Sequence, residues 1–401
     1  MSPSISKVKK PLTIAWISDF PVEWLPELPP PLQGSPRRHP ATWQIVLLSE
    51  FEKNADLKVH VILLRQKIQA DFSFERNGVV FHVLKSSAWL RPASLFWADT
   101  MLIRRLCKTI KPDLIHAWGI EKGAGLIASR LGYPYLVTVQ GLFAWYKQRV
   151  PLPVYFRFIE QLERFSLPRA PLVTTESAFA VSFLQQRFPG LCVHQAEHAP
   201  NEAFFHVVRR PQTTPLHLVA IGELSFRKGT DLLLQGLDRL RSTMPFKLTI
   251  VSGPDTAYLN SMRSQLPAAL WERVEFRHHI LPDQVAELLQ SPTIMLLPTR
   301  ADVSPNAVKE AVVAGVPVVA SEVGGIPDYV RSGENGILFS PDDLDAFLRA
   351  VQEAAQHPLF GRGQVKPASL DSSRAYLSPS RMAENFLAAY KRAFETARIA
   401  I

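Results

Sequence analysis

The sequence is poor in cysteine and lacks any long uncharged hydrophobic run. Its 2 cysteines, Cys107 and Cys192, cannot build a disulfide framework or a four-thiolate metal site, so we expect two buried thiols and a reducing compartment. No stretch of about 18 apolar residues is present, and residues 1–20 lack the apolar run and cleavage site of a secretory signal. These absences predict a cytoplasmic protein that does not span a membrane.

Length and composition are those of an ordinary globular protein. The 401 residues are about twice the usual length of one domain, so we expect two hydrophobic cores. With 47% hydrophobic and 20% charged residues, the chain is neither disordered nor fibrous. The net charge of +9 is uneven, because residues 1–205 hold 24 Lys and Arg against 16 Asp and Glu, and residues 206–401 hold 21 against 20. The first half is expected to meet an anionic surface or substrate, unless the charge serves solubility alone.

Short apolar runs alternate with helical patterns along the whole chain. We expect strands over residues 12–18, 57–64, 79–84, 114–117, 135–139, 172–175, 216–221, 246–251, 274–276, 293–297 and 316–320. We expect helices over residues 42–53, 94–110, 230–241, 282–289 and 305–314. This alternation predicts an α/β protein with mostly parallel sheets that helices cover on both faces.

Proline-rich segments divide the chain. The polar stretch 197–215 is typical of a linker. We therefore expect a first domain over residues 1–205, a second domain over 206–379, and a terminal helix over 380–401 that packs on either domain or crosses back to the first. Residues 21–40 contain 7 prolines and are expected to form a loop at the mouth of the cleft between the domains.

The strongest local signal is the segment IGELSFRKGTDLLLQGL, residues 221–237. A buried strand ends at Gly222, and Arg227 and Lys228 precede a helix that begins near Gly229. The free N–H groups and the dipole of that helix favour an anion, so the two cations would hold a diphosphate. The same pair is also typical of a solvated turn. Neither the Walker pattern nor a GxGxxG fingerprint occurs in the sequence.

A second signal is PTRADVSPNAVKEAVVAGVPVVASEVGGIPDYV, residues 298–330. Ser304 and Pro305 predict the N-cap and the first residue of a helix that carries Glu310, and Asp302 lies in the loop before it. A carboxylate in the first turns of a helix can accept both hydroxyl groups of a ribose. Glu310 also fits a solvated or salt-bridged helix residue.

In their order, these segments resemble a known family. The GEL-x-x-RKG turn, the acidic-x7-Glu segment, AVVAGVPVVAS-EVGGIPDYV and NGILFSPDD are similar to the retaining glycosyltransferases of family 4. Weaker counterparts in the first half are PDLIHAWG, YLVTVQG, LVTTES and EHAPNEAFF. The resemblance implies the GT-B fold, in which two Rossmann-like domains face a central cleft. It implies that residues 1–205 bind the acceptor and that residues 206–379 bind the nucleotide-sugar. It also implies retaining transfer of a hexose from a nucleotide-diphosphate sugar to a glycan, lipid-linked or small-molecule acceptor, with no cofactor or protein-bound metal.

The resemblance also implies roles for particular residues. Arg227 and Lys228 match the cations that hold the donor diphosphate and stabilise the leaving group, and Glu310 matches the carboxylate on the ribose. Asp302 stands where the family usually has a Glu that contacts the transferred sugar. Gln140 stands where the family often has a His, and it can donate a hydrogen bond but not a proton. The other donor-binding candidates are Gly222, Asn306, Ala307 and Val308, and the acceptor-side candidates are Asp19, His39 and His116.

Two questions stay open at this point. Residues 142–158, LFAWYKQRVPLPVYFRF, interleave aromatic with basic side chains, which fits an anionic membrane interface or a core-packed helix entry. Nucleic acid is not expected, because no recognised binding module accompanies the charge. The alternatives in function are a non-catalytic nucleotide-sugar-binding scaffold and a GT-B phosphorylase or epimerase. We expect the protein in the cytoplasm, or at the cytoplasmic membrane face if the first half binds lipid.

Overall fold

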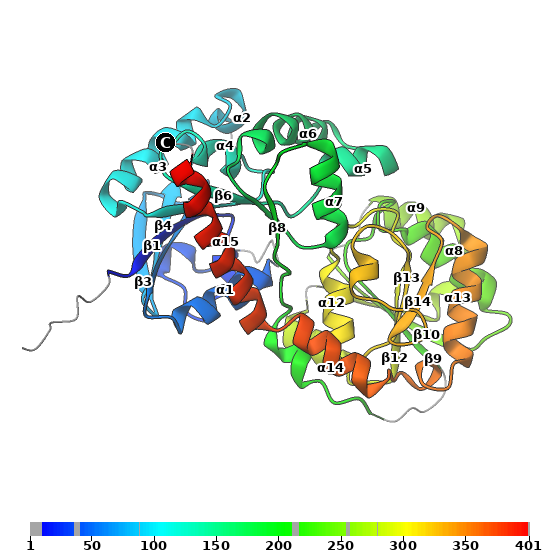
Figure 1. The fold of residues 1–401 in the computed structure, drawn as a ribbon. Coiled ribbons are helices and arrows are strands. Elements are labelled where there is room, and N and C mark those ends of the chain that lie inside the picture. Colours follow the sequence, from blue (N-terminus) through cyan, green and yellow to red (C-terminus); the bar gives the residue numbers. More distant parts are fainter. Residues whose placement is uncertain are drawn as a thin grey trace, which may run out of the picture.

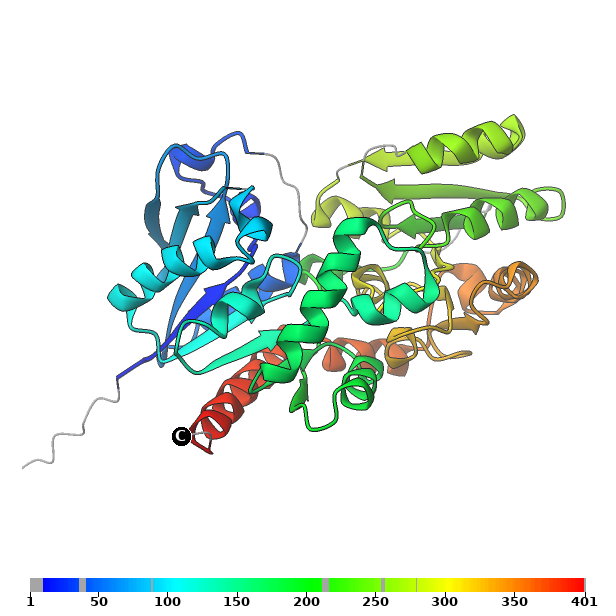
Figure 2. The same cartoon turned by 90° about the horizontal axis from the view of Figure 1, so that it is seen from above.

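Strands and helices alternate along the chain and build two domains that lie side by side (Figure 1; Figure 2). The computed structural model describes residues 10–35, 41–87, 89–210, 216–253, 257–278 and 280–399. In this part of the chain, strands of the first sheet end at Gln195 and strands of the second begin at Leu216. The connection between the domains therefore falls in the polar segment after residue 195.

The first domain is built around a sheet flanked by helices. Its strands are β1 (Leu12–Ile17), β2 (Leu57–Arg65), β3 (Phe72–Arg76), β4 (Val79–Lys85), β5 (Leu114–Trp118), β6 (Tyr135–Thr138), β7 (Val173–Thr175) and β8 (Val193–Gln195). Its α-helices are α1 (Thr42–Glu52), α2 (Leu90–Ala93), α3 (Trp97–Ile110), α4 (Ala124–Ala128), α5 (Phe143–Arg149), α6 (Val154–Ser166) and α7 (Ala178–Arg187). Its 3-10 helices are η1 (Val22–Trp24), η2 (Pro30–Leu32), η3 (Leu167–Arg169) and η4 (Glu202–His206).

The second domain has the same layered plan. Its strands are β9 (Leu216–Ile221), β10 (Phe246–Ser252), β11 (Val274–His278), β12 (Thr293–Leu297), β13 (Val318–Ser321) and β14 (Gly336–Phe339). Its α-helices are α8 (Thr230–Leu240), α9 (Ala257–Gln265), α10 (Ala268–Trp271), α11 (Pro282–Leu288), α12 (Asn306–Val313) and α13 (Leu344–Gln356). The chain ends with α14 (Pro367–Tyr376) and α15 (Pro379–Ile399), and its 3-10 helices are η5 (Ile326–Asp328) and η6 (Phe360–Arg362).

Each sheet reverses its direction of growth beside its first strand. Within the described residues the strand orders are β3-β4-β2-β1-β5-β6-β7-β8 and β11-β10-β9-β12-β13-β14, and only β3 pairs antiparallel. The chain thus moves outward from β1 through β2 and then crosses to β5, and it repeats this step from β9 through β10 to β12. Open parallel sheets bind ligands at the carboxyl ends of their strands, at this switch point where the strand order reverses. The two mostly parallel sheets predicted from the alternation are confirmed.

Alternating side chains along the strands feed separate hydrophobic clusters. On β1, Ile14 and Trp16 point into the cluster that α1 and α15 cover, whereas Ala15 and Ile17 point to the opposite face. This period of two is expected for a sheet buried on both faces. The cluster on the face of Ala15 and Ile17, the inner cluster, continues from the first domain into the second, where it includes Val219 of β9. Length predicted two cores; each domain has a cluster of its own, and the inner cluster, which both domains share, was not predicted.

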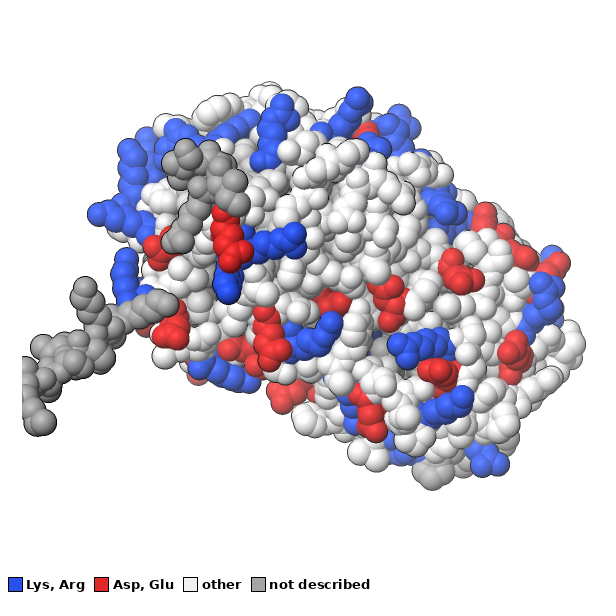
Figure 3. Space-filling view, in the orientation of Figure 1, with Lys and Arg blue, Asp and Glu red and all other residues white. Residues whose placement is uncertain are grey.

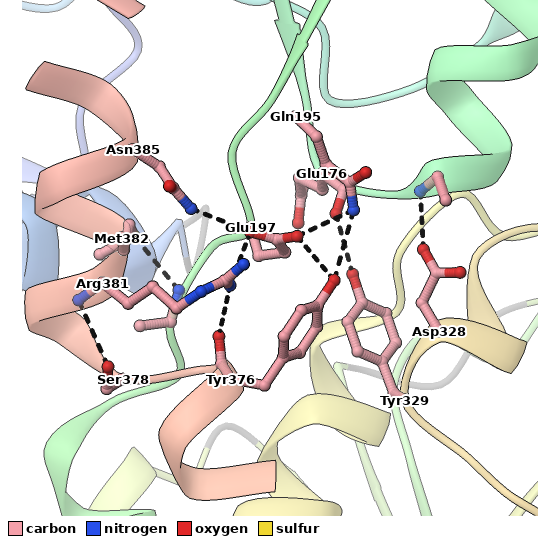
Figure 4. A network of polar contacts seen from close by, with 12 residues as sticks. Glu176, Gln195, Glu197, Asp328, Tyr329, Tyr376, Ser378, Arg381, Met382 and Asn385 are labelled. Atoms are coloured by element: carbon pink, nitrogen blue, oxygen red, sulfur yellow. Dashed lines mark hydrogen bonds and ion pairs between the residues drawn. The ribbon is translucent and has the colours of Figure 1, made fainter. Parts of the chain in front are cut away.

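The terminal helix α15 lies on the first domain, where it packs against α1 (Figure 1). The Tyr390 hydroxyl accepts a hydrogen bond from Trp16 Nε1 at 3.0 Å. Glu197, at the end of the first domain, accepts hydrogen bonds from the Tyr376 hydroxyl at 2.6 Å and from Arg381 Nη1 at 3.0 Å (Figure 4). A carboxylate between α14 and α15 therefore holds the chain where it crosses back from the second domain.

Local differences from the expected elements have physical reasons. Strands β3, β8 and β14 were not expected, because they are short and β3 alternates polar with apolar residues. Strands β3 and β4 are joined by a tight turn, in which Asn77 and Gly78 both have positive φ. The segment 21–40 is not wholly irregular, since η1 and η2 form within it and Leu32 is buried in the cluster that α1 and α15 cover. Residues 36–40 of that segment lie outside the described residues.

Candidate active site

A cavity of about 730 Å³ lies between the two domains. The first domain contributes Gln140, Glu121 and the α5–α6 connection to its wall, and the second domain contributes Glu223 and Arg227. These residues follow the carboxyl ends of β5, β6 and β9. The cavity is therefore the cleft that the two switch points predict.

The loop after β9 forms the wall on the side of the second domain. Gly222 ends the strand with φ +133° and lines a small neighbouring cavity together with Lys228. Gly229 begins α8 with φ +69°, and a Cβ there would lie 1.7 Å from the Pro298 carbonyl oxygen. Only glycine lets this loop approach the loop after β12 so closely. The predicted strand, turn and helix therefore occur where the sequence motif placed them.

The two cations of this loop converge on one carboxylate. Lys228 Nζ forms an ion pair with Asp302 Oδ2, and Arg227 Nη1 lies 3.8 Å from the same oxygen. Arg227 also donates to the Ala301 carbonyl at 3.0 Å, and its guanidinium lies 5.4 Å from the Tyr146 ring centroid of the first domain. The alternative of a solvated turn does not hold, because both cations are largely buried and paired across two loops. An incoming anion would compete with Asp302 for them.

The start of α12 corrects two expectations. Ser304 does not cap the helix; its hydroxyl lies 2.8 Å from the Tyr329 hydroxyl, and Pro305 occupies the N-cap position instead of the first helical position. The Val308 amide already donates to the Pro305 carbonyl at 3.1 Å, so it is not available to a ligand. Of the three predicted amide donors, Asn306 and Ala307 remain candidates.

Glu310 and its neighbour Lys309 face different surroundings on α12. No described residue forms an ion pair or a hydrogen bond with the Glu310 carboxylate. Burial raises its pKa to about 7, although Lys309 opposes the shift. Consecutive residues of a helix point about 100° apart, so Lys309 turns toward the first domain instead. Glu310 is thus a carboxylate held without a counter-charge.

Lys309 is part of a polar contact between the domains. Its Nζ lies 2.5 Å from Glu176 Oε2, and Glu176 Oε1 lies 3.1 Å from His198 Nδ1. Burial alone would raise the pKa of Glu176, but His198 and Lys309 outweigh it and hold the value at about 2. Beside it, the Tyr329 hydroxyl donates to the Glu176 carbonyl at 3.2 Å and Asp328 accepts from the Ala178 amide at 2.7 Å (Figure 4). The loop after β7 is therefore tied to the second domain.

The first-domain wall contains Gln140, directly beyond β6. Its Nε2 is buried and has no hydrogen-bond partner among the described residues. Asp19, after β1, lines the same cavity, where it pairs with Lys122 and lies 3.0 Å from Arg65 Nη1. The structure thus brings Gln140 and Asp19 to the cavity that Arg227 borders.

The two acceptor-side histidines are not in the cleft wall. His116 is fully buried inside the first domain, where Nδ1 lies 2.9 Å from the Tyr390 hydroxyl and Nε2 lies 2.6 Å from Thr138 Oγ1. Burial, followed by the nearby His198, lowers its pKa well below the ordinary value. His116 therefore packs α15 on the sheet, which corrects its expected contact with an acceptor. His39 lies outside the described residues.

The aromatic and basic segment 142–158 divides between the two expected locations. Phe143 and Trp145 are buried in the inner core, whereas Tyr155 is half exposed beside the cavity. Glu163 accepts from the Phe143 amide at 2.7 Å and from the Ala144 amide at 3.3 Å, which caps α5. Burial raises the pKa of Glu163 to about 7. The start of the segment is thus a core-packed helix entry, and most of its residues from 147 onward are exposed beside the cleft.

Sequence comparison places the chain in a family. Residues 47–190 match the family described as "Glycosyl transferase 4-like domain", and residues 215–357 match "Glycosyl transferases group 1". The chain belongs to the group 1 glycosyltransferases. The glycogen synthase of Mycobacterium tuberculosis is 24% identical over 265 residues, which cover 64% of each chain. A GDP-mannose-dependent alpha-(1-6)-phosphatidylinositol monomannoside mannosyltransferase of Mycolicibacterium smegmatis is 33% identical over 35% of this chain and 39% of its own. The matched stretch is therefore under two thirds of each relative's length.

Solved structures of other glycosyltransferases show the same GT-B fold. Sucrose-phosphate synthase from Thermosynechococcus elongatus superposes with a TM-score of 0.78 at 17% identity, over 96% of this chain and 99% of that one. The Anabaena protein HepE in complex with UDP-glucose superposes with a TM-score of 0.67 at 14% identity, over 95% and 99%. The resemblance inferred from the motifs, in family and in fold, is confirmed.

The sequence did not point to two groups at the domain junction: Glu121 and the Lys309–Glu176 pair. Glu121 follows β5, so the rule that ligands meet strand ends was the signal that could have found it. The partners of Lys309 depend on how the domains pack and left no local signal. In the described ranges, no group of three or more His, Cys, Asp or Glu side chains is arranged to hold a metal ion. No helix of the same ranges is long and apolar enough to cross a membrane.

Proposed function

We propose that this protein transfers a hexose from a nucleotide-diphosphate sugar to a hydroxyl group of an acceptor and retains the anomeric configuration. The observation that carries this proposal is the convergence of Arg227 and Lys228 on Asp302 at the wall of the interdomain cavity. Two cations beside the N-terminus of α8 suit a diphosphate, because the helix dipole and free N–H groups add to their charge. HepE, which has the same fold, is described with bound UDP-glucose.

The proposed chemistry depends on charge that develops on the leaving phosphate. When the bond from the sugar to the phosphate breaks, Arg227 and Lys228 stabilise the negative charge on the departing diphosphate. Asp302 is then released from the cations and lies where it can accept a hydrogen bond from the transferred sugar. The acceptor hydroxyl attacks from the face that the diphosphate leaves and gives its proton to a departing phosphate oxygen, which retains the configuration. We propose that turnover needs no cofactor or protein-bound metal, and an unchanged rate with EDTA would agree with this.

A lipid-linked or membrane-borne acceptor is the second part of the proposal. Trp89 is 83% exposed before α2, and Val154 is 81% exposed at the start of α6. Both segments contact the same loop, because Arg91 donates to the Lys122 carbonyl and Tyr155 donates to the Glu121 carbonyl. Exposed aromatic and apolar groups amid basic side chains favour an anionic lipid surface. A glycan or small-molecule acceptor remains compatible with the same cavity.

The decisive experiment measures binding and turnover of UDP-, GDP- and ADP-sugars. We expect one base to bind, and we expect Lys228→Ala to weaken its binding by about tenfold or more and to slow sugar transfer further. Lys53→Ala, at an exposed side chain directly after α1, is the matched control. Unchanged kinetics in Lys228→Ala would remove the diphosphate assignment.

The same assay separates the alternatives. Tight donor binding without transfer or hydrolysis, under varied acceptors, would favour a scaffold. Formation of a sugar phosphate from added inorganic phosphate would favour a phosphorylase, and rearrangement of the sugar without an acceptor would favour an epimerase. Product analysis by NMR tests retention, because an inverted anomer would contradict it.

A further inference from the structure

The loop after β5 places a carboxylate, Glu121, in the cavity opposite the donor loop. Glu121 lines the same cavity as Gln140 and Arg227. It stands where the first sheet has its switch point, since β5 is the strand beside β1. No role follows for it from the donor chemistry described above.

Two glycines leave the space that the Glu121 carboxylate occupies. A Cβ at Gly119 would lie 2.4 Å from Glu121 Oε2, and a Cβ at Gly141 would lie 3.7 Å from Glu121 Oε1. The Gln140 Oε1 atom lies 3.5 Å from the same position at Gly119. The carboxylate and the amide are therefore grouped around one point, where the loops after β5 and β6 meet.

Of the two groups, Gln140 lacks a partner for its Nε2 atom among the described residues, and the Glu121 carboxylate is held there only by backbone N–H groups of its own loop. Gln140 Nε2 is buried without a hydrogen-bond partner in the described part of the chain. Lys122, next to Glu121, pairs with Asp19 instead. Burial raises the pKa of Glu121, and the backbone N–H groups of Glu121 and Ile120 offset this only in part. A buried donor without a partner costs free energy, which a ligand that satisfies it recovers.

We propose that Glu121 and Gln140 together bind hydroxyl groups of a neutral sugar or polyol. A hydroxyl group can donate to the Glu121 carboxylate and accept from Gln140 Nε2, so one diol satisfies both. A phosphate or carboxylate ligand is disfavoured at this point, because Glu121 would repel it. The proposal rests on the proposed glycosyl transfer and deepens it. The hydroxyl groups belong to the acceptor or to the hexose of the donor, which share this chemistry.

The test compares Glu121→Gln with the wild type and with Glu202→Gln. The second variant removes the same charge from a side chain that is 83% exposed. Two ligands are titrated: methyl glycosides of neutral hexoses, followed by saturation-transfer NMR, and the nucleotide-sugars with their free nucleotides, followed by calorimetry. Unfolding transitions of all three proteins show whether the fold is kept.

We expect Glu121→Gln to weaken the binding of a hydroxyl-bearing ligand by about tenfold, because an uncharged amide accepts more weakly than a carboxylate. Weaker glycoside binding alone assigns the pair to the acceptor. Weaker nucleotide-sugar binding, with unchanged binding of the free nucleotide, assigns the pair to the donor hexose. Glu202→Gln should match the wild type for every ligand.

Two results would overturn the proposal. In the first, Glu121→Gln binds both types of ligand as tightly as the wild type does. In the second, the wild type binds no glycoside and binds nucleotide-sugars no more tightly than the free nucleotides. Failure of the proposed donor chemistry is recognised separately, because then no nucleotide binds to any of the three proteins.

Discussion

At the scale of single residues, some charged side chains of the site are paired with an opposite charge and one is not. Arg227 and Lys228 share Asp302, which cancels one of their two positive charges in the ligand-free cleft. Glu310 has no such counter-charge among the described residues, and burial raises its pKa to about 7. An ionised carboxylate without a partner lowers the free energy of unfolding of the ligand-free protein. Both of its oxygen atoms remain free to accept hydrogen bonds from ribose hydroxyl groups.

We expect Glu310→Gln to stabilise the ligand-free protein at pH 8. The pKa of Glu310 is about 7 in the folded protein against an ordinary 4.5, so the folded state holds this proton more tightly than the unfolded chain. The free energy of unfolding therefore falls as the pH rises from 4.5 to 7. The amide removes this loss, which we put at roughly 1–3 kcal/mol. Urea denaturation at pH 4 and pH 8 checks it, because the gain should appear only at pH 8.

Donor binding should respond to Glu310 in the opposite direction. Only the ionised carboxylate accepts from both ribose hydroxyl groups, so wild-type affinity for the donor should rise by about tenfold from pH 6 to pH 8. Glu310→Gln should bind more weakly, with a flat pH profile in calorimetry. A variant that keeps the affinity and the pH dependence of the wild type would contradict the ribose assignment.

At the scale of elements, loops of the second domain build the donor side by close backbone approach. The loop after β9 touches the loop after β12 at Gly229, and a Cβ at Gly324 would lie 1.9 Å from the Asp302 carbonyl oxygen. The side of α12 opposite the donor is held by the Lys309–Glu176 pair, in which Lys309 is fully buried. The position of Asp302 and Glu310 therefore depends on neighbouring elements and not on α12 alone.

Gly229→Ala should unfold more easily and bind the donor more weakly than the wild type. The added Cβ would lie 1.7 Å from the Pro298 oxygen, so the two loops must separate. Gly333→Ala is the matched control, because Gly333 also has positive φ but no atom within 4 Å of the added Cβ. We expect about 1 kcal/mol of destabilisation in the control and clearly more in Gly229→Ala. Equal thermal unfolding of the two variants would show that the close approach has no consequence.

Lys309→Met should destabilise the protein by about 3–5 kcal/mol, because it leaves the Glu176 carboxylate buried without its lysine partner. Adding Glu176→Gln to the same chain should recover part of this loss. Lys247→Met is the control; its pair with Glu275 is exposed, and its loss should cost less than about 1 kcal/mol. The measurement is chemical unfolding of five proteins: the wild type, the two single variants of the pair, the double variant and Lys247→Met. Additive losses in the double variant would argue against a coupled pair.

At the scale of the whole molecule, the charge and the apolar surface are concentrated on the first domain. Lys and Arg side chains gather along the edge formed by α2 and α3, at the upper left of Figure 3. Trp89 and Trp97, which are 83% and 48% exposed, belong to the same part of the chain. This arrangement limits the part of the segment 142–158 that belongs to the proposed lipid surface to the start of α6, and it adds the region around α2.

We expect the protein to co-sediment with vesicles that contain phosphatidylglycerol and not with vesicles of phosphatidylcholine alone. Binding should decrease between 0.1 M and 0.5 M salt, because screening shortens the reach of the basic side chains. The double variant Trp89→Ser, Trp97→Ser should bind several-fold more weakly. Val208→Ser, on a side chain that is 75% exposed in the interdomain connection, should bind as the wild type does. Binding that is indifferent to salt and to both tryptophans would exclude this surface.

Much of the fold was predictable, because helices and long strands follow from local periodicity. Strands β1, β9 and β12 begin where the apolar runs begin. The short strands β8 and β14 form only because a neighbouring strand pairs with them. Of the site residues, Arg227, Lys228 and Asp302 could be predicted because they lie in contiguous sequence motifs. His116 looked equally suitable, yet its surroundings are set by α15, more than two hundred residues away in the chain.

The sequence by itself determined the α/β alternation, the two domains, the donor motif and the family, since each depends on residues that are neighbours in the chain. Only the tertiary structure decided that Asp302 neutralises Lys228, that Lys309 turns to Glu176 and leaves Glu310 unpaired, and that Glu121 meets Gln140. These outcomes depend on which strand ends lie side by side and on which charges lose water when the domains pack. Burial and charge pairing between distant residues are collective, so local propensity does not encode them.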